Sequence, residues 1–181
     1  RQGEIKNFPQ ARINNKTLFT QADVKSRWAD NSVKHAILSF VTDVSADIPL
    51  KVEFINQSVG NNGGEMTKDQ MLAKSDWGGE IQTSIGSASA RAMLADWNGV
   101  DSGLNGRGVR YWLKGPIATQ VIVEDKTPSL TYDFGSDANR SLHPLFVLTF
   151  YPGTDMGVKV EYIVENMWTT KLQDQAYSLT L

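Results

Sequence analysis

The chain has 181 residues, 40% hydrophobic and 21% charged, which is enough apolar material for one medium-sized domain or two small ones. Its formal net charge is −2 and no basic block is present, so we expect no nucleic-acid partner bound through phosphates. The absence of cysteine excludes disulfides and thiolate zinc sites, and no apolar run approaches the roughly 20 residues of a membrane span, so we expect no membrane insertion.

The first part of the chain, residues 1–57, has the pattern of antiparallel β-strands. The stretches TQADVKSRWAD and SVKHAILSFVTDV flank Asp30-Asn31, which predicts two strands joined by a short turn. The stretch IPLKVEFINQ follows, with Leu50, Val52 and Phe54 on one parity and charged residues on the other. This alternation predicts a third, half-buried strand and therefore a meander.

The pattern changes in residues 58–110. The stretches VGNNGGE and WNGVDSGLNGRG are rich in glycine and predict loops. Between them, MTKDQMLAK predicts about two turns of helix with Thr67 as a candidate N-cap, and SASARAMLAD predicts a second short helix. We interpret this part as a central insertion that connects two β regions.

Strand patterns return in residues 111–181. YWLKGPIATQVIVED predicts two strands with a break at Gly115-Pro116, and SLTYDFG, PLFVLTFYPG, GVKVEYIVENMW and QAYSLTL follow at regular spacing. LFVLTFY is apolar on both parities, which predicts a strand buried on both faces. The sequence therefore predicts an all-β fold, an antiparallel barrel or sandwich, with one or two short helices in the central insertion.

The ends of the chain indicate a fragment or a domain of something longer. The sequence begins at Arg1 without the pattern of a leader, and it ends on YSLTL, an apolar alternation typical of a strand. We therefore expect additional domains of a longer chain among its partners.

The histidines and carboxylates give no clear catalytic group. His35 lies in a strand pattern and His143 precedes a proline at the start of another, so we interpret both as structural. Glu161 and Glu165 share a parity of one strand, where two carboxylates could flank a sugar or hold calcium. Glu165, beside Trp168, is a possible functional carboxylate, whereas a solvated sheet face explains Glu161 equally well.

Asp96, Asn98 and Asp101 resemble a calcium loop only in composition. They lack the complete spacing and the closing glutamate of such a loop, and turn geometry alone favours these residue types. We therefore expect no metal and no cofactor, with calcium as the one possibility left open. No motif for a nucleophile, a phosphate loop or a metal protease is present, so the catalytic residues, if there are any, stay unknown.

Tryptophans beside polar loops suggest contact with carbohydrate. Trp77 and Trp97 neighbour loops rich in Asp, Asn and Gly, and Trp97 has Asp96 and Asn98 on either side. Aromatic rings beside amides and carboxylates suit sugars, whose C–H faces stack on the ring while the hydroxyls bind the polar groups. The same two tryptophans are equally typical of a packed core, and both interpretations stay open.

The segment TQADVKSRWADNSVKHAILSF resembles the first domain of the YetA-like exo-acting rhamnogalacturonan lyases, which carries a Q-x-D/E…R-W-x-D-G-S-V/I-K/R pattern. The matching residues are Gln21, Arg27, Trp28, Asp30, Ser32, Val33 and Lys34. Asn31 replaces the glycine of the pattern, and asparagine also adopts left-handed conformations. The later KGP and the EN at the end of a strand are similar to the start of the family's central β-sandwich. The resemblance implies an N-terminal RIFT-type β-barrel followed by the start of that sandwich.

The resemblance also implies a function for the longer protein. Members are large secreted or surface-associated lyases with an α/α-toroid domain, for which this chain has no helical counterpart. No catalytic residue transfers to this chain by motif. We interpret Arg27, Trp28, Asp30 and Ser32 as a structural hairpin, in which the Trp28 ring caps the barrel core and Asp30 accepts turn amides.

We therefore expect a β-rich module of an extracellular or cell-surface polysaccharide-acting protein, bacterial or phage-encoded. The module is a non-catalytic scaffold or a portion that contacts glycan. The alternative is a structural or interaction domain of a surface, adhesion or phage tail protein without enzymatic activity. A stand-alone lyase or hydrolase ranks last, because no acid/base pair stands out.

Overall fold

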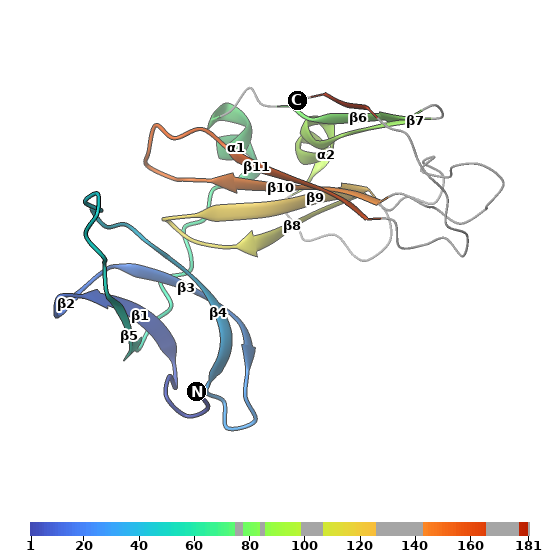
Figure 1. Ribbon diagram of the computed structural model, residues 1–181. Coiled ribbons are helices and arrows are strands. Elements are labelled where there is room, and N and C mark those ends of the chain that lie inside the picture. The colour runs from blue at the N-terminus through green and yellow to red at the C-terminus, as the bar shows by residue number, and fades with distance from the viewer. Residues whose placement is uncertain (75–77, 84–85, 99–106, 126–142, 166–177, 181) are drawn as a thin grey trace. The chain divides into compact units, whose positions relative to one another are not determined.

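The computed structural model describes residues 1–74, 78–83, 86–98, 107–125, 143–165 and 178–180. In these ranges the chain consists mainly of antiparallel strands, with two short helices (Figure 1). The predicted all-β class is therefore confirmed. The described strands form open sheets, and none of these sheets closes into a barrel.

The chain divides into two compact units, and each unit draws on separate stretches of sequence. Unit 1 comprises Arg1–Glu65, Leu113–Thr119 and Tyr151–Thr154, and unit 2 comprises Met66–Trp112, Gln120–Phe150 and Asp155–Leu181. The division thus does not follow the three consecutive segments expected from the sequence, since the chain returns to unit 1 twice.

Unit 1 is built from two small antiparallel sheets. Its strands are β1 (Phe8–Ile13), β2 (Lys16–Thr17), β3 (Thr20–Arg27), β4 (Val33–Phe40) and β5 (Val52–Gln57). The first sheet has the order β2-β1-β5, and the second is the β3-β4 hairpin (Figure 1). The hairpin predicted around Asp30-Asn31 and the strand predicted from IPLKVEFINQ are therefore both confirmed. The predicted meander is wrong, because β5 pairs with β1 and not with the neighbouring strand β4.

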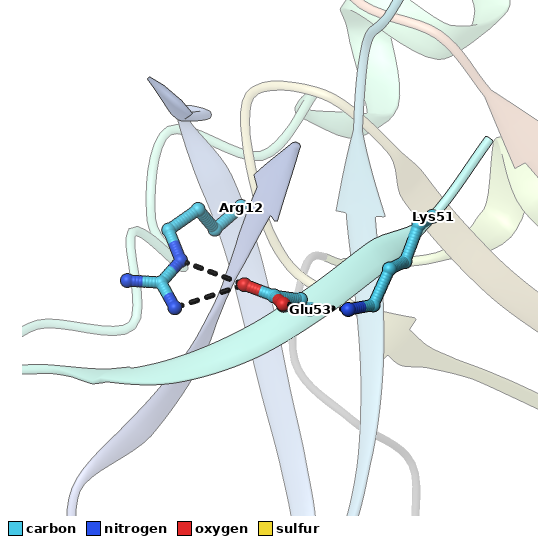
Figure 2. A network of polar contacts seen from close by, with 3 residues as sticks. All are labelled: Arg12, Lys51 and Glu53. Atoms are coloured by element: carbon cyan, nitrogen blue, oxygen red, sulfur yellow. Dashed lines mark hydrogen bonds and ion pairs between the residues drawn. The ribbon is translucent and has the colours of Figure 1, made fainter. Parts of the chain in front are cut away.

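The predicted burial of one face of β5 is wrong. Phe54 is 53% exposed and Leu50 is 38% exposed, although they share the apolar parity of the strand. On the other parity, Glu53 Oε2 accepts hydrogen bonds from Arg12 Nε and Nη2 at 3.1 and 2.9 Å, and Lys51 Nζ lies 3.1 Å from Glu53 Oε1 (Figure 2). The hydrogen bonds from Lys51 and Arg12 lower the pKa of Glu53. Neither face of this edge strand forms a buried core.

The remaining elements contain both helices. They are α1 (Lys68–Lys74), β6 (Glu80–Thr83), β7 (Gly86–Ser89), α2 (Ala90–Asp96), β8 (Arg107–Leu113), β9 (Thr119–Asp125), β10 (His143–Phe150), β11 (Lys159–Glu165) and β12 (Ser178–Thr180). β11, β10, β9 and β8 form one sheet in this order, and β12, β6 and β7 form another. The strands expected within SLTYDFG lie outside the described residues.

The core of unit 2 lies between the four-stranded sheet, the two helices and β6. β10 occupies an inner position of that sheet and is buried on both parities, with Phe146, Leu148 and Phe150 on one face and Leu145 and Thr149 on the other. The prediction from LFVLTFY is therefore confirmed. The buried cluster consists of Met66, Met71, Ile81, Ala90, Met93, Leu94, Trp97, Val109, Val121, Val123, Phe146, Leu148 and Phe150.

Both helices begin at capping residues. Thr67 Oγ1 accepts from the Gln70 amide at 3.3 Å, and Gln70 Oε1 accepts from the Thr67 amide at 2.8 Å, which is a reciprocal capping box. The predicted cap at Thr67 is thus confirmed. The second helix begins at Ala90, later than SASARAMLAD suggested, because the residues before it form β7 and Ser89 acts as the N-cap.

Candidate functional site

The turn between β3 and β4 is held by short-range polar contacts. The Trp28 amide donates to the Ser32 carbonyl at 2.8 Å, and Asn31 has a φ of 66°, the left-handed conformation that asparagine tolerates. Asp30 Oδ1 accepts from the Ser32 amide at 3.0 Å and from the Ser32 hydroxyl at 2.5 Å, and these bonds lower the pKa of Asp30. The Gly3 amide donates to Ser32 Oγ at 2.9 Å. Asp30 and Ser32 therefore stabilise a turn.

Arg27 connects this turn to the N-terminal segment. Its Nη1 donates to the carbonyl oxygens of Lys6 and Asn31 at 3.0 and 2.8 Å, and its Nη2 donates to the carbonyl of Asn7 at 2.8 Å. The guanidinium also lies 5.5 Å from the centre of the Phe8 ring. The guanidinium of Arg27 thus donates to three backbone carbonyls and holds the turn and the N-terminal segment together.

The prediction that the Trp28 ring caps a barrel core is wrong. The residue is 38% exposed, and Lys34 Nζ lies 4.7 Å from the centre of its ring. His35 is also exposed, opposite Ser26 at an irregularity in the pairing of β3 with β4. The ring lies at the surface because its strand ends there and the turn begins.

A buried polar cluster joins β3 to the segment between β8 and β9. Gln21, which is fully buried, accepts at Oε1 from the amides of Ile117 and Ala118 at 3.1 and 3.0 Å. Its Nε2 donates to the Ala118 carbonyl and to Asp23 Oδ2, both at 2.8 Å. The other oxygen of Asp23, Oδ1, accepts from the Lys114 amide at 3.0 Å. We call these residues, together with Gly115, the Gln21 cluster.

Gly115 fits against the side chain of Gln21. A Cβ at this position would lie 2.3 Å from Cδ and 2.4 Å from Oε1 of Gln21. Gly115 is not among the residues with positive φ, so close packing alone requires glycine there. The Gln21 cluster thus brings together the Q-x-D and KGP segments that the resemblance to the lyases singled out.

The candidate carbohydrate residues do not form one site. Trp97 is 5% exposed and packs edge to face on Tyr111 with ring centres 5.0 Å apart, so the core interpretation describes it and no sugar can stack on its face. Asp96 and Asn98 on either side of it are exposed. Trp77 lies outside the described residues.

The strand carboxylates are placed only in part. Glu165 ends β11 opposite His143 of β10 in the strand register, and the side chains of both lie outside what the structure describes. Glu161 is exposed, and its Oε1 lies 3.2 Å from Lys159 Nζ, which fits the solvated sheet face.

The sequence did not single out Glu124, a buried carboxylate of unit 2. Its side chain is 7% exposed, and its Oε1 lies 3.7 Å from Arg110 Nε. Glu124 is a charged residue near the end of the VIVED stretch, where the sequence pattern does not indicate burial. With an arginine beside it, Glu124 has the surroundings of a structural ion pair.

Two open hollows on the surface of unit 1 have room for a ligand. One has a volume of about 630 Å³ and lies beside Phe8, Phe19, Pro116 and the loop 58–63. Another, of about 690 Å³, has the charged residues Arg1 and Glu4 in its lining and reaches Phe54.

The described part of the chain has neither a metal-binding cluster nor a membrane-spanning helix. No cluster of three or more His, Asp or Glu side chains that could hold a metal ion is found there, and Asp101 lies outside it. No helix of that part has the length and apolar character to cross a membrane. No protein-family model, curated protein or solved structure matches the chain.

Proposed function

We propose that the chain is a β-rich, non-catalytic module of a secreted polysaccharide-acting protein similar to the rhamnogalacturonan lyases. In that protein it supports further domains and contacts glycan. One observation carries the proposal: the Q-x-D and KGP segments, more than 90 positions apart, meet in the Gln21 cluster. Two segments that resemble the same family therefore bind each other, as parts of one scaffold.

The non-catalytic role is supported by how the motif residues are used. Arg27 binds three backbone carbonyls, Asp30 binds Ser32, and Asp23 binds Gln21 and the Lys114 amide. A general acid or base must reach a substrate proton. These groups instead reach their own backbone and side-chain neighbours.

Two measurements on the 181-residue chain test the proposal. A glycan array with pectic and neutral polysaccharides tests the glycan contact, and we expect binding. Ultraviolet absorbance of unsaturated uronate products tests the lack of lyase chemistry, and we expect no signal with pectic substrates. Absence of any glycan binding would remove the module from this class, and sustained uronate absorbance would make it an enzyme.

A structural or interaction domain is the second candidate, and exposed aliphatic residues favour it. Between β4 and β5, Val41, Val44 and Ile48 are 76%, 74% and 66% exposed, and Leu50 is 38% exposed. Exposed apolar residues concentrated in one segment are typical of protein interfaces. Sedimentation velocity tests this candidate: an assembly that Ile48→Ser dissolves, in a chain that binds no glycan, would establish it.

A further inference from the structure

We propose that the hollow of unit 1 beside Phe19 is a binding site for a neutral saccharide. We call it the Phe19 hollow; its lining residues are Phe8, Phe19, Ser58, Val59, Gly60, Asn61, Asn62, Gly63 and Pro116. The inference rests on the proposed glycan contact and adds to it a location and a class of sugar.

An exposed aromatic ring forms one side of the hollow. Phe19 is 58% exposed, and hydrogen bonds hold the residues before and after it in place. The Leu18 amide donates to the Ala11 carbonyl at 2.9 Å, and Thr20 Oγ1 donates to the Leu18 carbonyl at 3.0 Å. The backbone therefore holds the ring at the surface, where a sugar can stack on it at little cost in ordering.

The loop that lines the hollow is held in place by the rest of unit 1. The Gly60 carbonyl accepts from the Ala22 amide at 2.7 Å, and Asn61 Nδ2 donates to the Thr20 carbonyl at 3.0 Å. A Cβ on Gly60 would lie 2.8 Å from the Phe8 ring, so the loop packs directly on that ring. The hollow is preformed, as most small-molecule sites are.

Polar groups in the lining of the same hollow are available to a ligand. Ser58 and Asn62 form no hydrogen bond with any residue in the described ranges, and both are exposed. A hydroxyl and a carboxamide donate and accept, which is what sugar hydroxyls require. This combination of a ring with unused polar groups favours a saccharide over an apolar peptide.

The charge of the hollow selects among saccharides. None of the nine lining residues is charged, whereas the other hollow carries Arg1 and Glu4. A uronate carboxylate in the Phe19 hollow would meet no lysine or arginine of the lining that could balance its charge. We therefore infer a neutral sugar unit as the ligand.

Isothermal titration of the 181-residue chain tests the inference. The probes are neutral cello-, xylo-, manno- and galacto-oligosaccharides, with oligogalacturonate as the acidic comparison. We expect one of the neutral probes to bind more tightly than oligogalacturonate. Phe19→Ala should weaken that binding roughly tenfold, as loss of one stacked ring does, and Asn62→Ala should weaken it severalfold.

Phe54→Ala is the matched control, because Phe54 is 53% exposed on the same unit and lines the other hollow. It should leave binding unchanged, and circular dichroism should show all three variants folded. Binding of oligogalacturonate alone, or binding that Phe19→Ala leaves intact, would overturn the inference while the proposed glycan contact stands. Binding of no saccharide would overturn both.

Discussion

The contact between Gly115 and Gln21 predicts a large and unusual cost for adding one methyl group. In Gly115→Ala the new Cβ would lie 2.3 Å from Gln21 Cδ, far inside the ordinary contact range of 3.4–4 Å. The buried Gln21 side chain would have to move, and the amides of Ile117 and Ala118 would lose their acceptor. Overpacking and unsatisfied buried amides together give a loss of about 2–4 kcal/mol in the free energy of unfolding.

The same structure predicts that this cost depends on Gln21. Gln21→Ala alone should also cost about 2–4 kcal/mol, because it removes all four hydrogen bonds of the carboxamide. Gln21→Ala removes the three atoms that lie nearest to the added Cβ, so in that background Gly115→Ala should cost less than about 1 kcal/mol. The two costs are therefore far from additive. Gly157→Ala is the control, since no atom lies within 4 Å of its added Cβ and its φ is not positive.

Amide hydrogen exchange measured by NMR is the appropriate assay, because two compact units need not unfold together. The Ile117 and Ala118 amides report on the Gln21 cluster directly. Gly115→Ala should reduce their protection, and Gly157→Ala should not. Equal loss of amide protection in Gly115→Ala and Gly157→Ala would refute the packing described for Gly115. Additive costs in the double variant of Gln21→Ala with Gly115→Ala would refute it as well.

Three further predictions concern local contacts. Arg27→Lys should cost about 1–2 kcal/mol in urea unfolding, because an ammonium cannot reach all three carbonyls that the guanidinium binds; an unchanged midpoint would contradict this role. Asp30→Ala should lower the Tm by a few degrees and leave glycan binding unaltered. The pKa of Asp30 is lowered in the folded chain, so the ionised carboxylate stabilises the fold fully above the ordinary aspartate pKa. This stabilisation is lost as the pH falls through the pKa of the folded state. The Tm of the parent chain and the Tm of Asp30→Ala should therefore converge in acid. Thr67→Ala should cost about 1 kcal/mol and speed exchange of the Gln70 amide, with no change in unit 1.

Most of the strands could be predicted because their signals are local. The Asp30-Asn31 turn and the doubly apolar β10 are visible within a few residues. The β1-β2 hairpin was missed, although Asn14 and Asn15 have φ values of 49° and 62° and form a two-residue turn between paired strands. Its flanking residues lack a clear alternation, so the pattern of hydrophobic residues did not indicate it.

The polar clusters were harder to predict because sequence distance hides them. Gln21 binds Ala118 across 97 positions, and nothing in either segment specifies this partner. The carbohydrate interpretation of Trp97 failed for a different reason. Its neighbours Asp96 and Asn98 are polar and exposed, but the end of α2 turns the ring into the core. The predicted burial of Phe54 failed because period-two alternation does not reveal whether any layer covers a strand face.

Direct titration of the 181-residue chain with soluble plant-type polysaccharides, neutral and pectic, tests the central claim of a glycan-contacting module. The account predicts saturable binding without release of unsaturated uronate. A chain that stays unliganded across the whole panel, or one that depolymerises a pectic substrate, would contradict it.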